Sequence, residues 1–309
     1  MPYELQVILT DEVGFMEIDP VKPDFLIIGA QKCGTTWLWH ILDQHPGTDL
    51  KNKKEIQYFS SSKNYHKGLK WYYQHFKDTD PEKIHGEAST DYFHDHVLID
   101  NRTIDRSLPT IPELIREALP EVKILLILRD PVQRAISAYY HHLQHRRFAP
   151  GTGIIKADEN HPRLRIIERG FYARYLKIWQ SVFPPEVMKC FIFEKDVLET
   201  PQDTVQKLYS FLGLDDDFTP QEYQRSRNKR WGWSHLWLNY HLGSWYGLIY
   251  RGLRHVLPPS LKDVLDEVDF VSERDISKTE IPVLNEVYHG ETEEVEELLS
   301  IDLGEWNGS

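Results

Sequence analysis

A glycine-rich loop lies directly between an apolar run and an amphipathic helical pattern. Residues 24–30 read DFLIIGA, a short apolar run that is typical of a buried strand. Residues 35–45 read TTWLWHILDQH and place apolar side chains at helical spacing until a Pro-Gly pair at 46–47 ends the pattern. A buried strand that passes through such a loop into a helix indicates an α/β fold.

The same order of strand and helix recurs twice further along the chain. Residues 123–129 (KILLILR) are a second apolar run, and a long helical pattern over 131–146 opens with Pro131 in its first turn. Residues 189–194 (KCFIFE) predict a third strand, followed by a helix over about 202–212. The alternation predicts an α/β fold with a P-loop-like central parallel sheet and helices on both faces.

The chain shows no internal repeat and no linker, so we expect one domain over residues 1–309. Its core is expected at about 22–213, with 214–309 supplying a pocket-covering segment and a C-terminal helix. Within these parts, 147–163 is expected to be an irregular insertion. The stretch 225–256, rich in Arg, Trp, Tyr and His, predicts neither a regular strand nor a regular helix and suggests a lid. An acidic helix, ETEEVEELL, is expected near the C-terminus with its charges facing solvent.

The composition is that of a globular protein outside membranes. Apolar residues make up 40% of the 309 residues and charged residues 27%. No stretch approaches the roughly 20 apolar residues of a membrane span, and the N-terminus lacks the basic region of a signal peptide. Two cysteines, Cys33 and Cys190, are too few for a disulfide framework. We therefore expect a cytoplasmic protein without a membrane partner.

The net charge restricts the partners. Lys and Arg total 36 and Asp and Glu total 48, so the formal charge is −12. Such a surface repels nucleic acid, whose binding needs a basic footprint, and we expect no nucleic-acid partner. It attracts a cationic small molecule. A homodimer is a candidate assembly.

The loop reads GAQKCGTT and resembles a phosphate-binding loop. Gly29 and Gly34 have the spacing of a Walker A loop, but Thr35 stands where the Walker lysine belongs, and the lysine is Lys32. Backbone N–H groups at the start of a helix bind anions, so we expect those of Gly34 through Trp37 to bind a phosphate. The alternative is a tight glycine turn with a solvent-exposed lysine.

The pattern Lys-x-Gly-Thr-Thr after an apolar strand resembles the 5′-phosphosulfate loop of sulfotransferases. These enzymes use 3′-phosphoadenosine 5′-phosphosulfate (PAPS) as donor. The family's second motif, R-D-P-x-x-R-x-x-S, is present as RDPVQRAIS at 129–137. The resemblance implies that Arg129 and Ser137 hold the 3′-phosphate, and a guanidinium at a strand end suits that role. Alternatively Arg129 pairs with Asp130 or a surface acid. Arg134 either binds phosphate or makes a structural pair.

A third set of segments is similar to the heparan-sulfate branch of that family. KEIQYF at 54–59, NYHKGLKWY at 64–72 and EASTDYF at 87–93 carry the likeness. It implies that Glu55 is the catalytic base and that Lys32 meets the charge that develops on the leaving oxygen. His85, His94 and His96 are the candidates for an alternative histidine base, as in the steroid and phenol enzymes of the family, and His94 and His96 lie just beyond the 87–93 segment. The likeness is specific over 24–140 and looser to 213.

The late basic loop of the heparan-sulfate enzymes is not found. The nearest cluster is RSRNKR at 225–230, which either caps the donor, through Arg230, or is a solvated loop. The ending at 281–306 resembles bacterial sulfotransferases of small-molecule pathways. The residues expected to bind the donor are Gln31, Lys32, Cys33, Gly34, Thr35, Thr36, Trp37, Arg129, Ser137 and Arg230.

The resemblance implies sulfuryl transfer from PAPS to a hydroxyl or amine of a small acceptor. A cationic natural product or an amino sugar fits the acidic surface. We expect no metal, because the loop lysine supplies the positive charge. Two alternatives remain, a P-loop kinase or nucleoside triphosphatase acting on a small molecule, and a nucleotide-binding module without catalysis. The lysine position and the lack of a Walker B acid other than Asp130 argue against the first. Intact Lys32 and Glu55 argue against the second.

Overall fold

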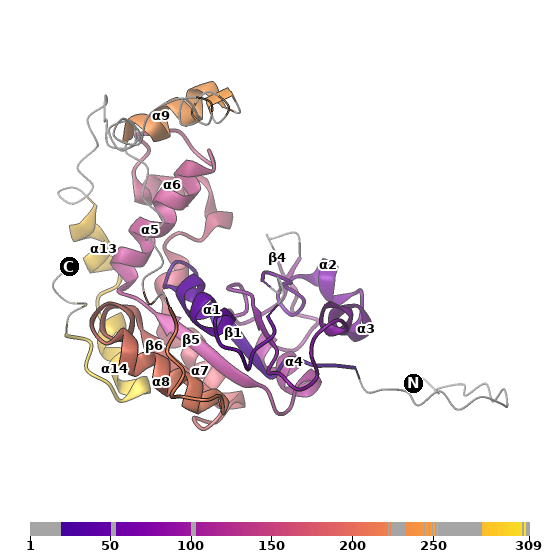
Figure 1. The fold of residues 1–309 in the computed structure, drawn as a ribbon. Helices are drawn as coiled ribbons and strands as arrows, with labels where there is room; N and C mark the ends of the chain where they lie inside the picture. Colours follow the sequence, from indigo (N-terminus) through magenta and orange to yellow (C-terminus); the bar gives the residue numbers. More distant parts are fainter. Residues whose placement is uncertain are drawn as a thin grey trace.

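Four parallel strands form the central sheet of this computed structural model (Figure 1). They are β1 (Phe25–Gly29), β2 (Gly86–Ala88), β5 (Lys123–Leu128) and β6 (Met188–Ile192), in the order β2-β1-β5-β6. A separate antiparallel pair joins β3 (Leu98–Ile99) and β4 (Thr103–Ile104). The residues that the structure describes are 20–50, 54–99, 103–221, 223, 233–243, 245, 246, 248, 250, 252, 280–304 and 306.

The central strands are apolar on both faces because helices cover the sheet on both sides. Phe25 through Ile28 have no exposed surface, and neither do Ile124 through Leu128. Phe25 pairs with Gly86 on one side and with Lys123 on the other. A Cβ atom at Gly86 would lie 2.1 Å from the Phe25 ring, so glycine is required where these strands meet.

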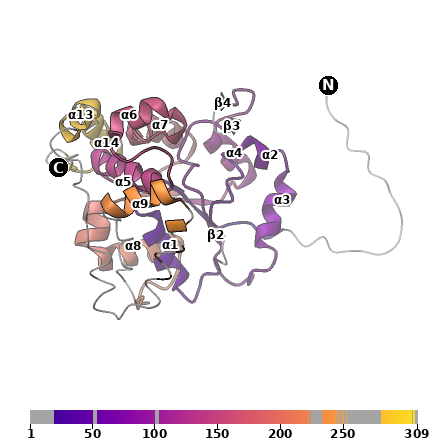
Figure 2. The same cartoon turned by 90° about the horizontal axis from the view of Figure 1, so that it is seen from above.

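Two groups of helices cover the two faces (Figure 2). One group holds α1 (Thr35–Asp43) and α8 (Pro201–Leu212), which the Tyr209 hydroxyl joins by donating to the Ile41 carbonyl over 3.0 Å. The other holds α7 (Tyr172–Val182), packed between α4 (Ile111–Ala118) and α14 (Glu291–Leu299). The expected sheet with helices on both faces is confirmed.

Short elements complete the described part of the chain. They are α2 (Ser62–Tyr65), α3 (Leu69–Tyr73), η1 (Gln74–Phe76), η2 (Pro162–Leu164), η3 (Glu168–Gly170) and a π-helical turn η4 (Phe193–Glu199). Within the described ranges, no helix combines the length and apolarity that a membrane crossing needs.

A second apolar cluster lies along α5 (Pro131–Gln144), the helix that follows β5. Three helices pack against it, namely α6 (Ile154–Asn160), α9 (Trp233–Leu242) and α13 (Ile281–Val287). Arg134 is fully buried here, where its guanidinium donates to the Ile166 carbonyl and meets the Tyr288 hydroxyl at 3.5 Å. Of the two roles left open for Arg134, the structure therefore supports the structural one.

Two expectations about local structure are wrong, and a third is wrong in one detail. The stretch 147–163 is not wholly irregular, because α6 forms within it and buries Ile154 and Ala157. The stretch 225–256 contains α9, a regular helix that packs on α5. The acidic helix α14 is confirmed, but Glu291 faces inward and accepts a hydrogen bond from the Ala173 N–H at 2.7 Å.

The strand order places a switch point between β1 and β5. The chain leaves β1 toward β2 at one edge of the sheet, and it leaves β5 toward β6 at the other edge. Where neighbouring connections diverge in this way, a crevice opens at the carboxyl ends of the strands and open α/β sheets bind ligands there. The glycine-rich loop follows β1 and Arg129 follows β5, so both lie at this crevice.

Beside the switch point, β2 carries a fully buried carboxylate, Glu87. Three hydroxyls donate to it, from Tyr72 on α3 at 2.6 Å, from Ser89 at 2.6 Å and from Tyr92 at 2.8 Å. Burial raises the pKa of Glu87 to about 7. The network therefore fastens α3 and the 89–93 segment to the sheet through a group that ionises in the folded protein only near neutral pH.

We predict that Tyr72→Phe destabilises the protein more at pH 8 than at pH 6. Above pH 7 the buried Glu87 carboxylate is charged and needs its donors, so the loss at pH 8 is about 1–3 kcal/mol. The matched control is Tyr73→Phe, whose hydroxyl donates to the neutral Ala118 carbonyl at 3.1 Å and whose effect should not vary with pH. Urea unfolding at both pH values measures the difference. An equal Tyr72→Phe effect at both would contradict the prediction.

Candidate active site

The loop after β1 is held in place by one backbone hydrogen bond to the neighbouring strand β5 and one within the loop. The Ala30 N–H donates to the Ile127 carbonyl on β5 at 2.7 Å, and the Cys33 N–H donates to the Ala30 carbonyl at 3.2 Å. Lys32 and Gly34 both have positive φ, at 69° and 108°. The chain therefore curls tightly between the end of β1 and the start of α1.

Three N–H groups at the start of α1 are left without an acceptor in the described structure, those of Gly34, Thr35 and Thr36. They are orphan donors of a helix N-terminus, where the helix dipole also favours an anion. The Trp37 N–H is different, because it donates to the Gly34 carbonyl at 2.8 Å. The Trp37 N–H is thus engaged within the first turn, and its part in phosphate binding stays a prediction. The Trp37 indole N–H reaches the Tyr223 carbonyl at 2.7 Å.

Gly34 is required by the packing beneath the loop. A Cβ atom there would lie 2.7 Å from the ring of Phe193, the residue after β6, and φ of 108° is strained for any other residue. The end of β6 thus forms the floor of the loop.

The Cys33 side chain is buried and is held by neighbouring groups. The Cys33 thiol is buried, lies 3.6 Å from the Tyr172 hydroxyl, and has its pKa raised to about 11 by burial. The backbone carbonyl of Gln31 accepts a hydrogen bond from that thiol at 3.7 Å. Cys33 therefore offers an anion neither its thiol nor its N–H group.

Arg129 follows β5 directly and lies close to Lys32. Burial lowers the pKa of Lys32, and the positive charge of Arg129 lowers it further. The Arg129 guanidinium stacks over the Phe193 ring at 5.0 Å, and its Nε lies 3.6 Å from a carboxylate oxygen of Glu194. Two cations are thus gathered at the switch point beside one acid.

The acid beside Arg129 is not Asp130. The Asp130 carboxylate caps α5 instead, accepting from the N–H groups of Val132 at 2.7 Å and Gln133 at 3.2 Å. Ser137 lies two turns into the same helix and is half-buried. Farther along, His141 has its pKa lowered to about 4 by burial and by the charge of Lys32, so α5 runs past the loop.

Glu55 lies at the other side of the loop, next to the end of β2. Its N–H donates to the Ala88 carbonyl at 2.6 Å. Its carboxylate accepts from the Thr90 hydroxyl at 3.3 Å and from the Gln57 amide at 3.3 Å. The Thr90 carbonyl would lie 3.3 Å from a Cβ atom on Gly29, so the chain that supports Glu55 touches the start of the phosphate loop.

The Glu55 side chain is accessible to solvent, yet its surroundings disfavour its charge. Partial desolvation by the protein raises the pKa of Glu55, and the negative charge of Asp91 raises it further. Asp91 is itself held by Arg169 at 2.6 Å and by the Gln57 amide at 3.2 Å. A carboxylate with a raised pKa at an accessible position is suited to accept a proton.

Two of the three histidines proposed as alternative bases, His94 and His96, have partners of their own. His96 Nδ1 is 3.5 Å from an Asp95 oxygen, and its backbone bridges to Thr110. His94 is buried against Tyr175, where burial and several arginines hold its pKa well below its usual range. Within the described residues, no hydrogen bond, ion pair or ring contact joins either histidine to Lys32. Arg230 and the rest of 225–230 lie outside the described residues.

The rings of His141 and His145 lie on one face of α5 with centroids 4.3 Å apart and planes tilted by 45°. Across the described residues, no set of three or more His, Cys, Asp or Glu side chains is placed to hold a metal ion.

Comparison with known proteins identifies the family. The profile of the sulfotransferase domain matches residues 22–230. The chain belongs to the sulfotransferase family. The match includes the loop, Glu55, Arg129 and the strand-end residues Phe193 and Glu194.

Two relatives show where the chain is similar. It is 30% identical over 219 residues to the bifunctional heparan sulfate N-deacetylase/N-sulfotransferase 3 of Mus musculus, covering 65% of this chain and 23% of that protein. It is 29% identical over 213 residues to the mouse heparan sulfate glucosamine 3-O-sulfotransferase 5, covering 66% of this chain and 57% of that protein. The chain thus spans about a quarter of the first relative and just over half of the second.

The fold is shared with a solved bacterial protein. The sulfotransferase from Alicyclobacillus acidocaldarius aligns with a TM-score of 0.62 and 24% identity, over 93% of this chain and 99% of that one. The sulfotransferase fold is therefore confirmed well beyond the segments that carry the motifs.

Several residues of the site carry no signal in the sequence. Asp91 and Arg169 meet across 78 positions of sequence, and Glu194 reaches Arg129 from the next strand. Trp306 donates to Glu194 at 3.2 Å from the far end of the chain. Among these residues, Glu194 alone has a position in the sequence that indicates a place in the site. It comes just after an apolar strand, as Arg129 does.

Proposed function

We propose that this sulfotransferase moves the sulfuryl group of PAPS to a hydroxyl or amine of a small acceptor. The observation that carries the proposal is the pair of anion sites at one switch point. One is formed by the free N–H groups of Gly34, Thr35 and Thr36 with Lys32, and the other by Arg129. A nucleotide with separate 5′ and 3′ phosphate groups offers two anions to match them.

The residues fit the donor in chemical type. The N–H groups at the start of α1 would hold the 5′-phosphate, since a helix N-terminus favours an anion. Arg129 would hold the 3′-phosphate with its planar fork, and Ser137 on α5 would add a hydroxyl donor. The Cys33 thiol, engaged elsewhere, would take no part.

The transfer needs a base and a positive charge in place. The acceptor oxygen or nitrogen forms a bond to sulfur, while the bond from sulfur to the bridging oxygen of the 5′-phosphate breaks. Glu55 would take the acceptor's proton, and Lys32 would stabilise the charge on the leaving oxygen of the bisphosphate product. A half-buried lysine acts more strongly on that charge than one in water would.

The acceptor is proposed to be an amino sugar or another small cationic molecule. The formal charge of −12 favours such a molecule at the surface. Two relatives are named for heparan sulfate, and one of them for its glucosamine. Asp91 beside Glu55 adds a second negative group at the place where the acceptor would meet the base.

A P-loop kinase is the second candidate, and the structure weakens it. Asp130 is the acid that could take the Walker B role after β5, but one of its oxygens caps α5 through two N–H groups. Lys32 lies within the turn of the loop, before Gly34, rather than at the helix start where a Walker lysine follows the second glycine.

We predict that the protein binds 3′-phosphoadenosine 5′-phosphate (PAP) more tightly than ATP with Mg²⁺. Arg129→Ala should weaken PAP binding roughly 10-fold to 100-fold, the value of a charge-assisted contact. Titration calorimetry measures the affinities for PAP and for ATP with Mg²⁺. The matched control is Arg116→Ala, on the far helix α4. A preference for ATP with Mg²⁺ would favour the kinase instead.

We predict that Glu55→Gln lowers kcat by roughly 10²-fold to 10⁴-fold, because the acceptor's proton loses its base. PAP affinity should stay within about twofold of the parent, since Glu55 lies on the acceptor side of the loop. Glu113→Gln on α4 is a control for loss of a surface carboxylate. Near-full turnover of Glu55→Gln together with a dead His96→Ala would move the role to His96.

We predict that Asp91→Asn shifts the acidic limb of the kcat/KM profile to lower pH. The charge of Asp91 raises the pKa of Glu55, so its removal lowers that pKa and keeps the base ionised in more acidic solution. Asp95→Asn is the matched control, because Asp95 pairs with His96 and Arg174 instead. A shift to higher pH, or none, would contradict the coupling between Asp91 and Glu55.

A further inference from the structure

The C-terminal residues after α14 return to the carboxyl end of β6. Leu303 and Trp306 are buried there, with 3% and 4% of their surfaces exposed. The Trp306 indole lies edge-on to the Tyr172 ring at 6.0 Å, and its N–H donates to a Glu194 oxygen at 3.2 Å. Trp306 lies beyond residues 22–230, the part that matches the family.

The Glu194 carboxylate has several partners. One oxygen accepts from the Trp306 indole, and the other faces Arg129 Nε at 3.6 Å. Backbone N–H groups of Glu194 and Asp130 also favour its charged form. A carboxylate with a single partner can rotate about its last bonds, whereas one held on both oxygens has a fixed plane. Trp306 thus adds a side-chain donor that helps to fix the orientation in which Glu194 meets Arg129.

Arg129 is constrained on three sides by this arrangement. The Tyr172 hydroxyl donates to its backbone carbonyl at 2.8 Å, the Phe193 ring lies under its guanidinium, and Glu194 faces Nε. In the described structure nothing accepts a hydrogen bond from its two terminal nitrogens. These nitrogens form the edge that a phosphate can take in two parallel hydrogen bonds.

We propose that Trp306 is a positioning residue for the donor's 3′-phosphate, acting through Glu194 on Arg129. The inference rests on the donor site proposed above. It assigns to the C-terminal tail a part in donor recognition. A guanidinium whose orientation is already fixed loses less conformational entropy when it binds. It therefore binds the phosphate more tightly than a mobile guanidinium does.

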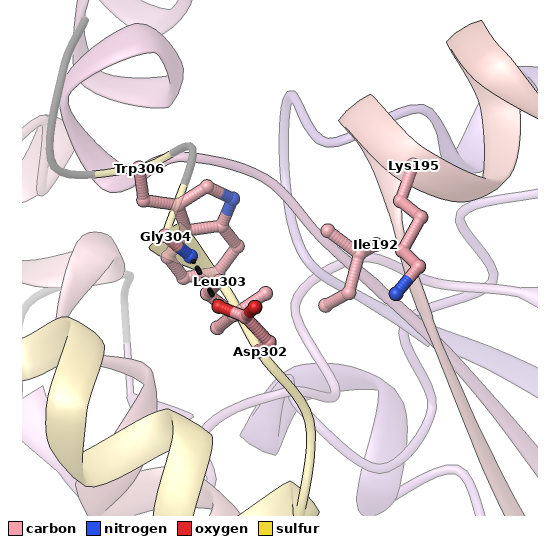
Figure 3. Close-up of a pocket in the computed structure, with 6 residues that line it drawn as sticks. All are labelled: Ile192, Lys195, Asp302, Leu303, Gly304 and Trp306. Carbon is pink, nitrogen blue, oxygen red and sulfur yellow. Dashed lines mark hydrogen bonds between the residues drawn. The ribbon is translucent and has the colours of Figure 1, made fainter.

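A cavity of about 260 Å³ lies beside this contact (Figure 3). Ile192 and Lys195 line one side, and the tail from Asp302 to Gly304 with Trp306 lines the other. Trp306 lines this cavity with only 4% of its surface exposed, so a smaller side chain at 306 enlarges the cavity. Two substitutions of different shape, Phe and Met, are therefore compared.

The test compares PAP with AMP, which lacks the 3′-phosphate, in titration calorimetry. Trp306→Phe and Trp306→Met both remove the indole donor. Each should weaken PAP binding about threefold to tenfold, the value of one hydrogen bond, and leave AMP binding within twofold. Trp237→Phe, at a half-exposed position on α9, is the matched control and should change neither affinity. In Arg129→Ala protein, Trp306→Phe should have no further effect on PAP.

An equal loss of PAP and AMP affinity would overturn the proposal, since it would show that the tail only supports the fold. So would unchanged PAP affinity in both Trp306 variants. A parent protein that binds PAP no better than AMP would instead show that the 3′-phosphate site itself is wrong. That result would remove the donor assignment together with the role of Trp306, and it is visible before any variant is made.

Discussion

The pairing of β1 with β5 is the constraint on which the site depends. It buries two apolar strands side by side and fixes the ends of both at one edge of the sheet. The hydrogen bond from the Ala30 N–H to the Ile127 carbonyl carries that register into the loop. The free N–H groups at the start of α1 and the guanidinium of Arg129 are thereby held at one edge of the sheet, where the donor is proposed to bind.

The charged groups of the candidate site lie in surroundings that disfavour their charged forms. Burial lowers the pKa of Lys32, and desolvation raises the pKa of Glu55. Both shifts disfavour the charged form, and each charged group lies beside a charge of its own sign, Arg129 and Asp91. Such arrangements cost stability and are concentrated at functional sites. A donor with several negative charges would relieve the repulsion between the two cations.

Much of the fold follows from local sequence. The strands at 25–29 and 123–128 and the helices after them are encoded by contiguous apolar patterns and by the residues that end them. The strand β2 has three residues, too few to show a period. The helix α9 was missed because WSHLWLNYHL carries apolar and aromatic side chains on every face, so no helical stripe stands out.

The candidate site was predictable only where its residues belong to a contiguous motif. Lys32, Glu55 and Arg129 were found in this way. The partners that tune them, Asp91, Arg169, Glu194 and Trp306, are brought in by strand order and by the returning tail, which no local pattern records. A cytoplasmic location, a homodimer and the division of the chain near residue 213 stay predictions.

The most direct test of the central claim is a crystal structure of the protein with PAP. We predict the 5′-phosphate on the N–H groups of Gly34, Thr35 and Thr36, and the 3′-phosphate on the terminal nitrogens of Arg129, with Glu194 still facing Nε. A bisphosphate bound elsewhere, or one with its 3′-phosphate away from Arg129, would contradict the account.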